Sequence, residues 1–247
     1  MIKFYCLSKI SLLKMINYLI HTLQKMYDFY IIAPIYFLLN LYSWCYFLIE
    51  DRKTWDTFTR FISSCNALQC SIMVYRVIRN NLDLSSLYFK PEEYYTNSLF
   101  WFASYLFVDG LFQLPDLYSY FSFSLLLSIL HHAVGGFGIY LIAEARMGFF
   151  LGFYFAMTEV STPLLNLSWY YRHNYLFTAF YIVFFLCRIV TIPFLLNYLY
   201  QNAEYISTLG TLRSSMCFYA SYTLIALNLI WFIFLTKKVF VSKNIKF

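Results

Sequence analysis

Charged residues are scarce in this chain of 247 residues, of which only 12% are Asp, Glu, Lys or Arg. Soluble globular domains contain about 25% of these residues. None of the four types occurs between Asp116 and Glu144, and a run of about 18 or more such residues predicts a membrane-spanning helix. A soluble enzyme, a disordered chain and a nucleic-acid-binding module are therefore excluded as leading interpretations. The net charge of +6 is assigned to segments that face lipid headgroups.

Metal-ligand spacings and the motifs of soluble enzymes are also missing from the sequence. The six cysteines form no C-x-x-C pair, the spacing expected of many metal and redox sites. No phosphate loop or nucleophile elbow occurs. His131 and His132 are adjacent, so they lie about 100° apart around a helix and cannot clasp one metal as an i, i+4 pair does. We expect neither a metal site nor a bound cofactor.

Seven apolar segments predict an all-α, polytopic membrane protein with about seven transmembrane helices. The expected spans are residues 29–49, 61–78, 94–114, 120–143, 147–167, 174–200 and 214–236. The first 28 residues carry four lysines between short apolar runs. This pattern predicts a basic interfacial helix rather than a secretory signal, which needs one unbroken apolar run.

Proline and tryptophan positions refine these boundaries. Pro115 and Asp116 are expected to end the third span, because proline lacks the N–H donor and clashes with the preceding turn. Pro163 and Pro193 lie inside expected spans and should kink them, which neighbouring helices can tolerate in lipid. Three tryptophans are expected at the membrane–water interface, where amphipathic rings settle: Trp55, Trp169 and Trp231.

Ionisable residues inside a membrane span are costly and mark candidate functional sites. Charge-free runs of 12 residues flank Glu159 on each side, and each is too short to cross the membrane alone. The fifth span must therefore contain Glu159, and the same argument places Arg188 in the middle of the sixth. His131 and His132 lie deep in the fourth span, whereas Asp109 is nearer the end of the third.

The expected turns give these residues relative depths. With turns near residues 145 and 173, His132, Glu159 and Arg188 lie 13, 14 and 15 residues from a turn, or about 20 Å along a helix. Neighbouring antiparallel helices would then form a His–Glu–Arg layer at mid-membrane. Asp109, with 116 − 109 = 7 residues to its turn, should lie shallower. A purely structural role stays open, with interhelical hydrogen bonds worth about 0.6 kcal/mol each and Arg188 acting as a counter-ion.

Four segments of the sequence, taken in their order along the chain, are similar to those of a known family. They are YTNSLFWFASYLFVD (95–109), the pair His131-His132, TEVSTPLLNLSW (158–169) and FFLCRIVTIP (184–193). Together they resemble the TLC-domain family, which includes ceramide synthases and the translocon-associated TRAM proteins. The resemblance implies a six-helix bundle over residues 54–238 with its polar layer inward, usually in the endoplasmic reticulum. Residues 1–53 would be a basic segment with a first transmembrane helix, and 239–247 a basic tail.

The sequence departs from the ceramide-synthase pattern in the third segment. In those enzymes the His-His pair is followed 28 positions later by an aspartate, then a serine and a second aspartate. Glu159 takes the place of the first acid, since 159 − 131 = 28, and Ser161 that of the serine. Thr162 replaces the second acid, and Thr158 replaces a histidine. The chain is thus more similar to non-synthase members, which are linked to membrane lipid composition and to lipid or cargo handling.

The resemblance and the polar layer together lead to three functional hypotheses. We expect a protein of lipid homeostasis that binds or senses a lipid chain, with membrane lipids as its partners. The alternative is an N-acyltransferase acting on acyl-CoA and a long-chain base, in which the catalytic residues would be His131, His132 and Glu159. Its substrate-binding residues would be Asp109, Ser161 and Arg188. A secretory-pathway cargo adaptor is a third hypothesis, although the expected loops are short.

Overall fold

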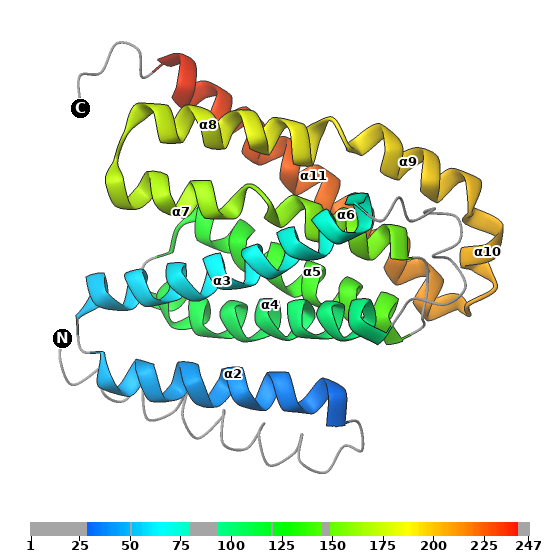
Figure 1. The fold of residues 1–247 in the computed structure, drawn as a ribbon, viewed down its shortest axis with the longest axis horizontal. Helices are drawn as coiled ribbons and strands as arrows, with labels where there is room; N and C mark the ends of the chain where they lie inside the picture. Colours follow the sequence, from blue (N-terminus) through cyan, green and yellow to red (C-terminus); the bar gives the residue numbers. More distant parts are fainter. Residues whose placement is uncertain (1–28, 50, 80–92, 120, 145–148, 242–247) are drawn as a thin grey trace.

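The computed structural model describes residues 29–49, 51–79, 93–119, 121–144 and 149–241. The interfacial helix expected before residue 29 and most of the basic tail lie outside these ranges. Secondary structure in the described part is entirely helical (Figure 1). The elements are α2 (Phe29–Leu48), α3 (Arg52–Arg79), α4 (Glu93–Ser119), α5 (Phe123–Glu144), α6 (Phe149–Glu159), α7 (Thr162–Tyr171), α8 (Asn174–Phe184), the π-helix η2 (Phe185–Ile189), α9 (Ile192–Gln201), α10 (Ala203–Ser207) and α11 (Thr211–Val241).

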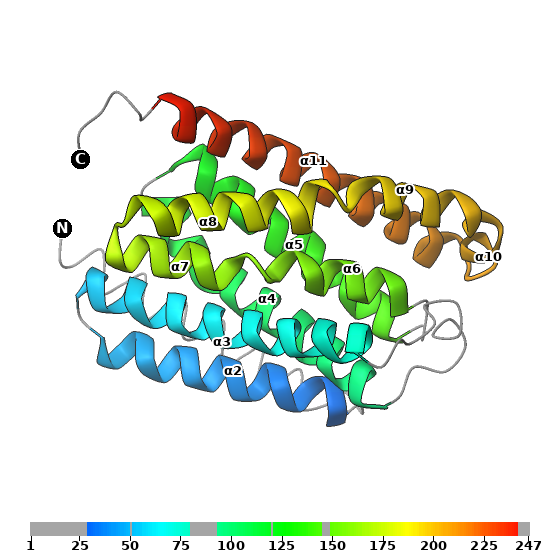
Figure 2. The ribbon, with the colours of Figure 1, turned by 45° about the horizontal axis from the view of Figure 1, so that its top comes forward.

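Four helical segments of the described chain are long and apolar enough to cross a membrane. They are Arg52–Arg79, Phe123–Ala143, Asn174–Gln201 and Thr211–Phe240. The third of these runs through α8, η2 and α9, which follow one another in nearly the same direction (Figure 2). The prediction of an all-α protein with several membrane-spanning helices is therefore confirmed.

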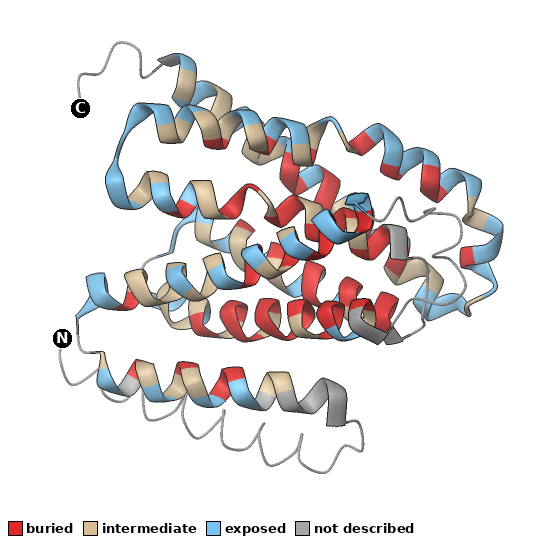
Figure 3. Ribbon diagram, in the orientation of Figure 1, coloured by how far each residue is buried: buried red, intermediate tan, exposed pale blue. Residues whose placement is uncertain are grey.

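Contacts between the helices close a ring of six members. α3 packs on α4, α4 on α5, α5 on α11, α11 on α8 and η2, α8 on α7, and α7 on α3. α6 precedes α7 in the chain and lies nearly in line with it (Figure 2). It contacts α3, α5 and η2. α2 lies outside the ring and packs on α4 (Figure 1). Because α4 is covered on both sides, buried residues dominate it, whereas exposed residues recur along α8 and α9 (Figure 3).

The helices break where the two inner prolines lie. Pro163 and Pro193 occupy the first turns of α7 and α9, positions where the missing N–H donor would have no helical partner in any case. α7 follows a break directly after Glu159. α9 follows the π-helix, closed by a hydrogen bond of 3.0 Å from Val190 N to Phe185 O. The expected interruptions of the fifth and sixth spans are confirmed.

The prediction that Pro115 and Asp116 end the third span is wrong, since α4 continues to Ser119. A proline here removes a single backbone hydrogen bond, and only four residues of helix follow it. Arg52, in the first turn of α3, pairs with Asp116 and holds this last turn of α4 against the neighbouring helix. The longer helix places Asp109 ten residues from the helix end, since 119 − 109 = 10, rather than the seven expected.

α3 begins nine residues before the span expected from 61 onward, since 61 − 52 = 9. Asp51 caps this start, because its Oδ1 accepts a hydrogen bond of 2.8 Å from the Thr54 backbone N–H, the usual geometry of an N-cap. Hydrogen bonds from the side chain and the backbone of Thr54 lower the pKa of Asp51. The cap extends the helix beyond its apolar part into a charged first turn.

Two of the three tryptophans expected at the membrane–water interface pack against rings within the protein. Trp55 is buried against Tyr42 and Phe112, with ring centroids 6.1 and 5.9 Å away. Trp231 lies ten residues before the end of α11, since 241 − 231 = 10, with its ring centroid 5.0 Å from that of His131. Contacts with other rings place these side chains inside the protein.

Gly138 allows α5 and α11 to approach closely, because a Cβ atom at this position would lie 2.9 Å from Ala220 Cβ. We expect Gly138→Ala to destabilise the fold by about 1–3 kcal/mol, the usual cost of overpacking. The measurement is the midpoint of thermal unfolding in detergent micelles. Adding Ala220→Gly removes the opposing methyl group, so the double variant should recover part of the loss. A double-mutant cycle with no favourable coupling would contradict this contact.

Candidate functional site

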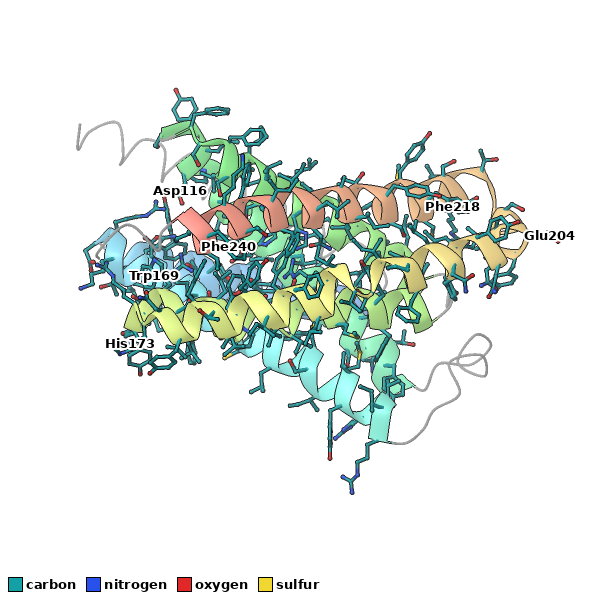
Figure 4. The ribbon with its side chains drawn as sticks, turned by 90° about the horizontal axis from the view of Figure 1, so that it is seen from above. Asp116, Trp169, His173, Glu204, Phe218 and Phe240 are labelled. Carbon is teal, nitrogen blue, oxygen red and sulfur yellow. The ribbon has the colours of Figure 1, made fainter. Side chains whose placement is uncertain are left out.

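A cavity of about 610 Å³ lies within the six-helix ring. Its wall comes from every member of the ring, over residues 52–63, 105–116, 124–132, 159–166, 180–188 and 231–238. Arg52 and Lys238 are exposed at its mouth, whereas Glu159 and Arg188 are buried at its inner end. From Arg52 to Ser63 the cavity follows 11 residues of α3, or about 16 Å. It therefore runs from one end of the bundle, marked by Asp116 and Trp169 in Figure 4, to the middle.

The wall changes character along the cavity. Its apolar part consists mostly of aromatic side chains: Trp55, Phe112, Phe180, Phe184, Trp231 and Phe234, with Leu125, Leu165 and Leu235. Its inner end carries the ionisable residues on which the sequence analysis concentrated. Polar and charged side chains also line the cavity along its length, from Arg52 at the mouth to Glu159 at the inner end. Apolar surface beside convergent polar groups is typical of small-molecule binding sites.

Glu159 is the centre of the inner group, and it is only 5% exposed. Its Oε1 lies 3.7 Å from both His131 Nε2 and Arg188 NH2, while its Oε2 accepts a hydrogen bond of 2.8 Å from Thr162 Oγ1. Thr162 lies three residues after Glu159, at the start of the new helix that follows the break. The predicted meeting of His131, Glu159 and Arg188 is confirmed.

Arg188 is paired through every nitrogen of its guanidinium. Nε donates to Ser161 Oγ at 3.3 Å, NH1 donates to Asn228 Oδ1 at 3.2 Å, and NH2 faces Glu159. The plane also lies over the Phe184 ring, 5.0 Å from its centroid. Arg188 belongs to the π-helix, a rare element found often at functional sites. These contacts hold the Arg188 guanidinium beside Glu159 as its counter-ion.

A second buried group surrounds Asp109. Its Oδ2 lies 3.1 Å from His132 Nδ1 and accepts a hydrogen bond of 2.6 Å from Gln113 Nε2. Its Oδ1 accepts a hydrogen bond of 2.9 Å from the Tyr42 hydroxyl. The two histidine rings are 5.6 Å apart, so the two groups are neighbours but use different acids. Across the described residues, no cluster of three or more His, Cys, Asp or Glu could hold a metal ion.

All six residues expected from the sequence line the cavity: Asp109, His131, His132, Glu159, Ser161 and Arg188. The sequence analysis missed several of their partners. Gln113 and Asn228 are polar side chains within long helices, so the cost of burying an amide could have singled them out. Tyr42 could not be found in this way, because it is one of 25 tyrosines in the chain.

No protein-family model, curated protein or solved structure matches this chain. The resemblance to the TLC-domain family therefore rests on the four sequence segments, and the site is interpreted from its own geometry.

The Glu159–Arg188 pair should show strong energetic coupling. Arg188→Met leaves a buried carboxylate without its counter-ion, and removing one partner of a buried pair costs about 3–5 kcal/mol. Adding Glu159→Gln removes the orphaned charge, so the double variant should be more stable than Arg188→Met alone. Thermal unfolding in detergent micelles measures the cycle, and Lys237→Met, at an exposed position, is the control. Additive losses would show that the two side chains do not stabilise each other.

Proposed function

We propose that this chain is a multi-pass membrane protein that binds a lipid chain within its six-helix ring. Seven crossings are proposed: α2, α3, α4, α5, α6 with α7, α8 with α9, and α11. In this arrangement the cavity is open toward one membrane surface and ends near mid-membrane. We infer from the sequence resemblance that the membrane is that of the endoplasmic reticulum and that the process is lipid homeostasis.

The cavity is the observation that carries this proposal. Its volume of about 610 Å³ falls within the range of about 300–1,000 Å³ typical of small-molecule sites. Aromatic side chains such as Phe180, Phe184 and Trp231 line it and supply an apolar surface for hydrocarbon. Burial of a methylene group against such a surface is worth about 0.8 kcal/mol.

Unpartnered polar atoms in the wall indicate that the ligand also carries a polar group. His131 Nδ1 and Gln113 Oε1 are buried without a hydrogen-bond partner, and both residues line the cavity. An unsatisfied buried polar atom costs about 1–3 kcal/mol, which a ligand with a hydrogen-bonding headgroup or linkage would offset. The ligand proposed here is therefore amphiphilic rather than a pure hydrocarbon.

Filling the cavity should abolish lipid binding. Ser128 lines the cavity from α5, and Ser128→Trp would place an indole in the space assigned to the ligand. Lipid that co-purifies with the protein, quantified by mass spectrometry after gentle detergent extraction, should fall at least tenfold in this variant.

Leu130→Trp is the matched control for this test, because Leu130 lies on the same helix, is 42% exposed and is absent from the cavity wall. It should retain the lipid of the unsubstituted protein. Equal amounts of lipid in both variants, or none in the unsubstituted protein, would overturn the proposal.

A second candidate function, acyl transfer to an amine, is favoured by the free nitrogen of His131. Its Nδ1 has no partner, while Nε2 faces Glu159; an imidazole held in this way can act as a general base. In the reaction an amine nitrogen attacks the thioester carbonyl of acyl-CoA, the imidazole accepts the amine proton, and the carbon–sulfur bond breaks. The coenzyme A thiolate leaves and takes up a proton.

Microsomes that contain the protein, supplied with acyl-CoA and a long-chain base, test this second function. An acyltransferase should form the amide product, and His131→Ala combined with His132→Ala should lower the rate at least a hundredfold by removing the general base. Immunoblotting of the microsomes normalises the rates to protein level. Product formation that is unchanged in the double variant would exclude the catalytic role of both histidines.

A further inference from the structure

Tyr42 reaches the cavity site from a helix that does not belong to the ring. α2 packs on the outer side of α4, and outward-facing residues such as Trp44 are 69% exposed. Tyr42, by contrast, is fully buried, and its hydroxyl donates a hydrogen bond of 2.9 Å to Asp109 Oδ1. The rings of Trp55 and Phe112 lie within about 6.1 Å of its own ring and fix the direction of the hydroxyl.

The hydrogen bonds to Asp109 determine how its carboxyl group can interact with His132. Tyr42 donates to one oxygen and Gln113 donates to the other. Both oxygens of Asp109 therefore act as acceptors. His132 Nδ1 lies 3.1 Å from Asp109 Oδ2 and 3.4 Å from Gln113 Nε2, and the amide nitrogen of Gln113 can only donate. A proton on Nδ1 is directed at the carboxylate oxygen, which is the closer of the two atoms and the one that accepts.

We propose that Tyr42 is a positioning residue that, through the Asp109 carboxylate, holds His132 as the tautomer protonated at Nδ1. In this tautomer the lone pair lies on Nε2, which makes that nitrogen the proton acceptor of His132. A carboxylate that fixes the tautomer of a neighbouring histidine in this way is a recurring device of acid–base sites. His132 lines the cavity, so the acceptor belongs to the same chamber as the His131 group.

His131 faces its acid with the other ring nitrogen, Nε2. His131 turns Nε2 toward Glu159 and leaves Nδ1 without a partner, whereas His132 turns Nδ1 toward Asp109. Adjacent helical residues differ by about 100° in direction, so each histidine meets an acid on a different helix. The two rings therefore offer opposite nitrogens, and only His132 depends on α2.

Nitrogen-15 NMR of the full chain in detergent micelles tests this inference, because imidazole nitrogen shifts report directly which nitrogen carries the proton. The chain has four histidines, and single substitutions assign their signals. His132 should be protonated at Nδ1 in the unsubstituted protein. Tyr42→Phe removes the hydrogen bond that holds Asp109 Oδ1, so the carboxylate is free to turn away from His132 Nδ1 and a population of His132 protonated at Nε2 should appear.

Tyr46→Phe is the matched control, since Tyr46 is also on α2 and its ring packs on the same Trp55 and Phe112. It should leave the His132 signals unchanged, and the His131 signals should be the same in all variants. The thermal midpoint of each variant reports whether it folds. A change confined to stability, with identical His132 signals, would reduce Tyr42 to a packing residue.

Asp109→Asn is a second, independent variant. Tyr42 donates to Oδ1, so the amide oxygen of asparagine should occupy that place and the NH₂ group should face His132 Nδ1. A donor at this point requires Nδ1 to accept, which moves the His132 proton to Nε2. The inference is overturned if His132 is protonated at Nε2 in the unsubstituted protein, or if either Tyr42→Phe or Asp109→Asn leaves the His132 tautomer unchanged. The measurement needs no lipid and no substrate, so its outcome is separate from that of the proposed function.

Discussion

The burial of the Glu159 carboxylate is the constraint on which the arrangement of the ring depends. Moving an ion from water into a protein interior costs several kcal/mol unless partners surround it. Here His131 and Arg188 face one oxygen, and Thr162 donates to the other. These partners come from α5, η2 and α7, so satisfying one charge fixes the relative position of three elements. The chain departs from regular α-helix at both members of the ion pair, with a break after Glu159 and a π-helix that contains Arg188.

The meeting of His131, Glu159 and Arg188 could be predicted because helical rise is constant and because charge-free runs limit where a span can lie. The level of Asp109 could not, since it depended on where α4 ends. α4 continues past Pro115 to Ser119, and Asp116 pairs there with Arg52 of the neighbouring helix, a contact that the sequence alone does not reveal. Tyr42 could not be predicted for a similar reason, since its contact with Asp109 arises from the packing of α2 on α4. Tyrosine is also so common in this chain that its residue type did not distinguish it.

Two separate His–acid pairs share one chamber, and this bears on how lipid binding and chemistry relate. A buried polar group that served only to join helices would need no accessible histidine, yet both histidines line the cavity. A lipid bound along the aromatic wall would bring its polar group to these residues. The two proposed functions, lipid binding and acyl transfer, would therefore use the same residues. The contribution of Tyr42 extends this site beyond the region 54–238 that the sequence resemblance delimits.

The π-helix also sets how the chain tolerates changes in length. Its hydrogen bond from Val190 to Phe185 spans five residues where an α-helix spans four, so the turn holds one residue more than regular helix would. The extra residue is accommodated within this one turn, so α8 and α9 keep the register of a continuous helix on either side of it. Deleting one residue between 185 and 189 would close the turn to regular α-helix and leave the buried faces of α8 and α9 in place, but it would remove the wide turn that carries Arg188. Deleting a residue elsewhere in α8 or α9 would instead rotate the following helix by about 100°. The π-helix is therefore the point where this segment can lose a residue with the least effect on packing and the greatest effect on the polar site.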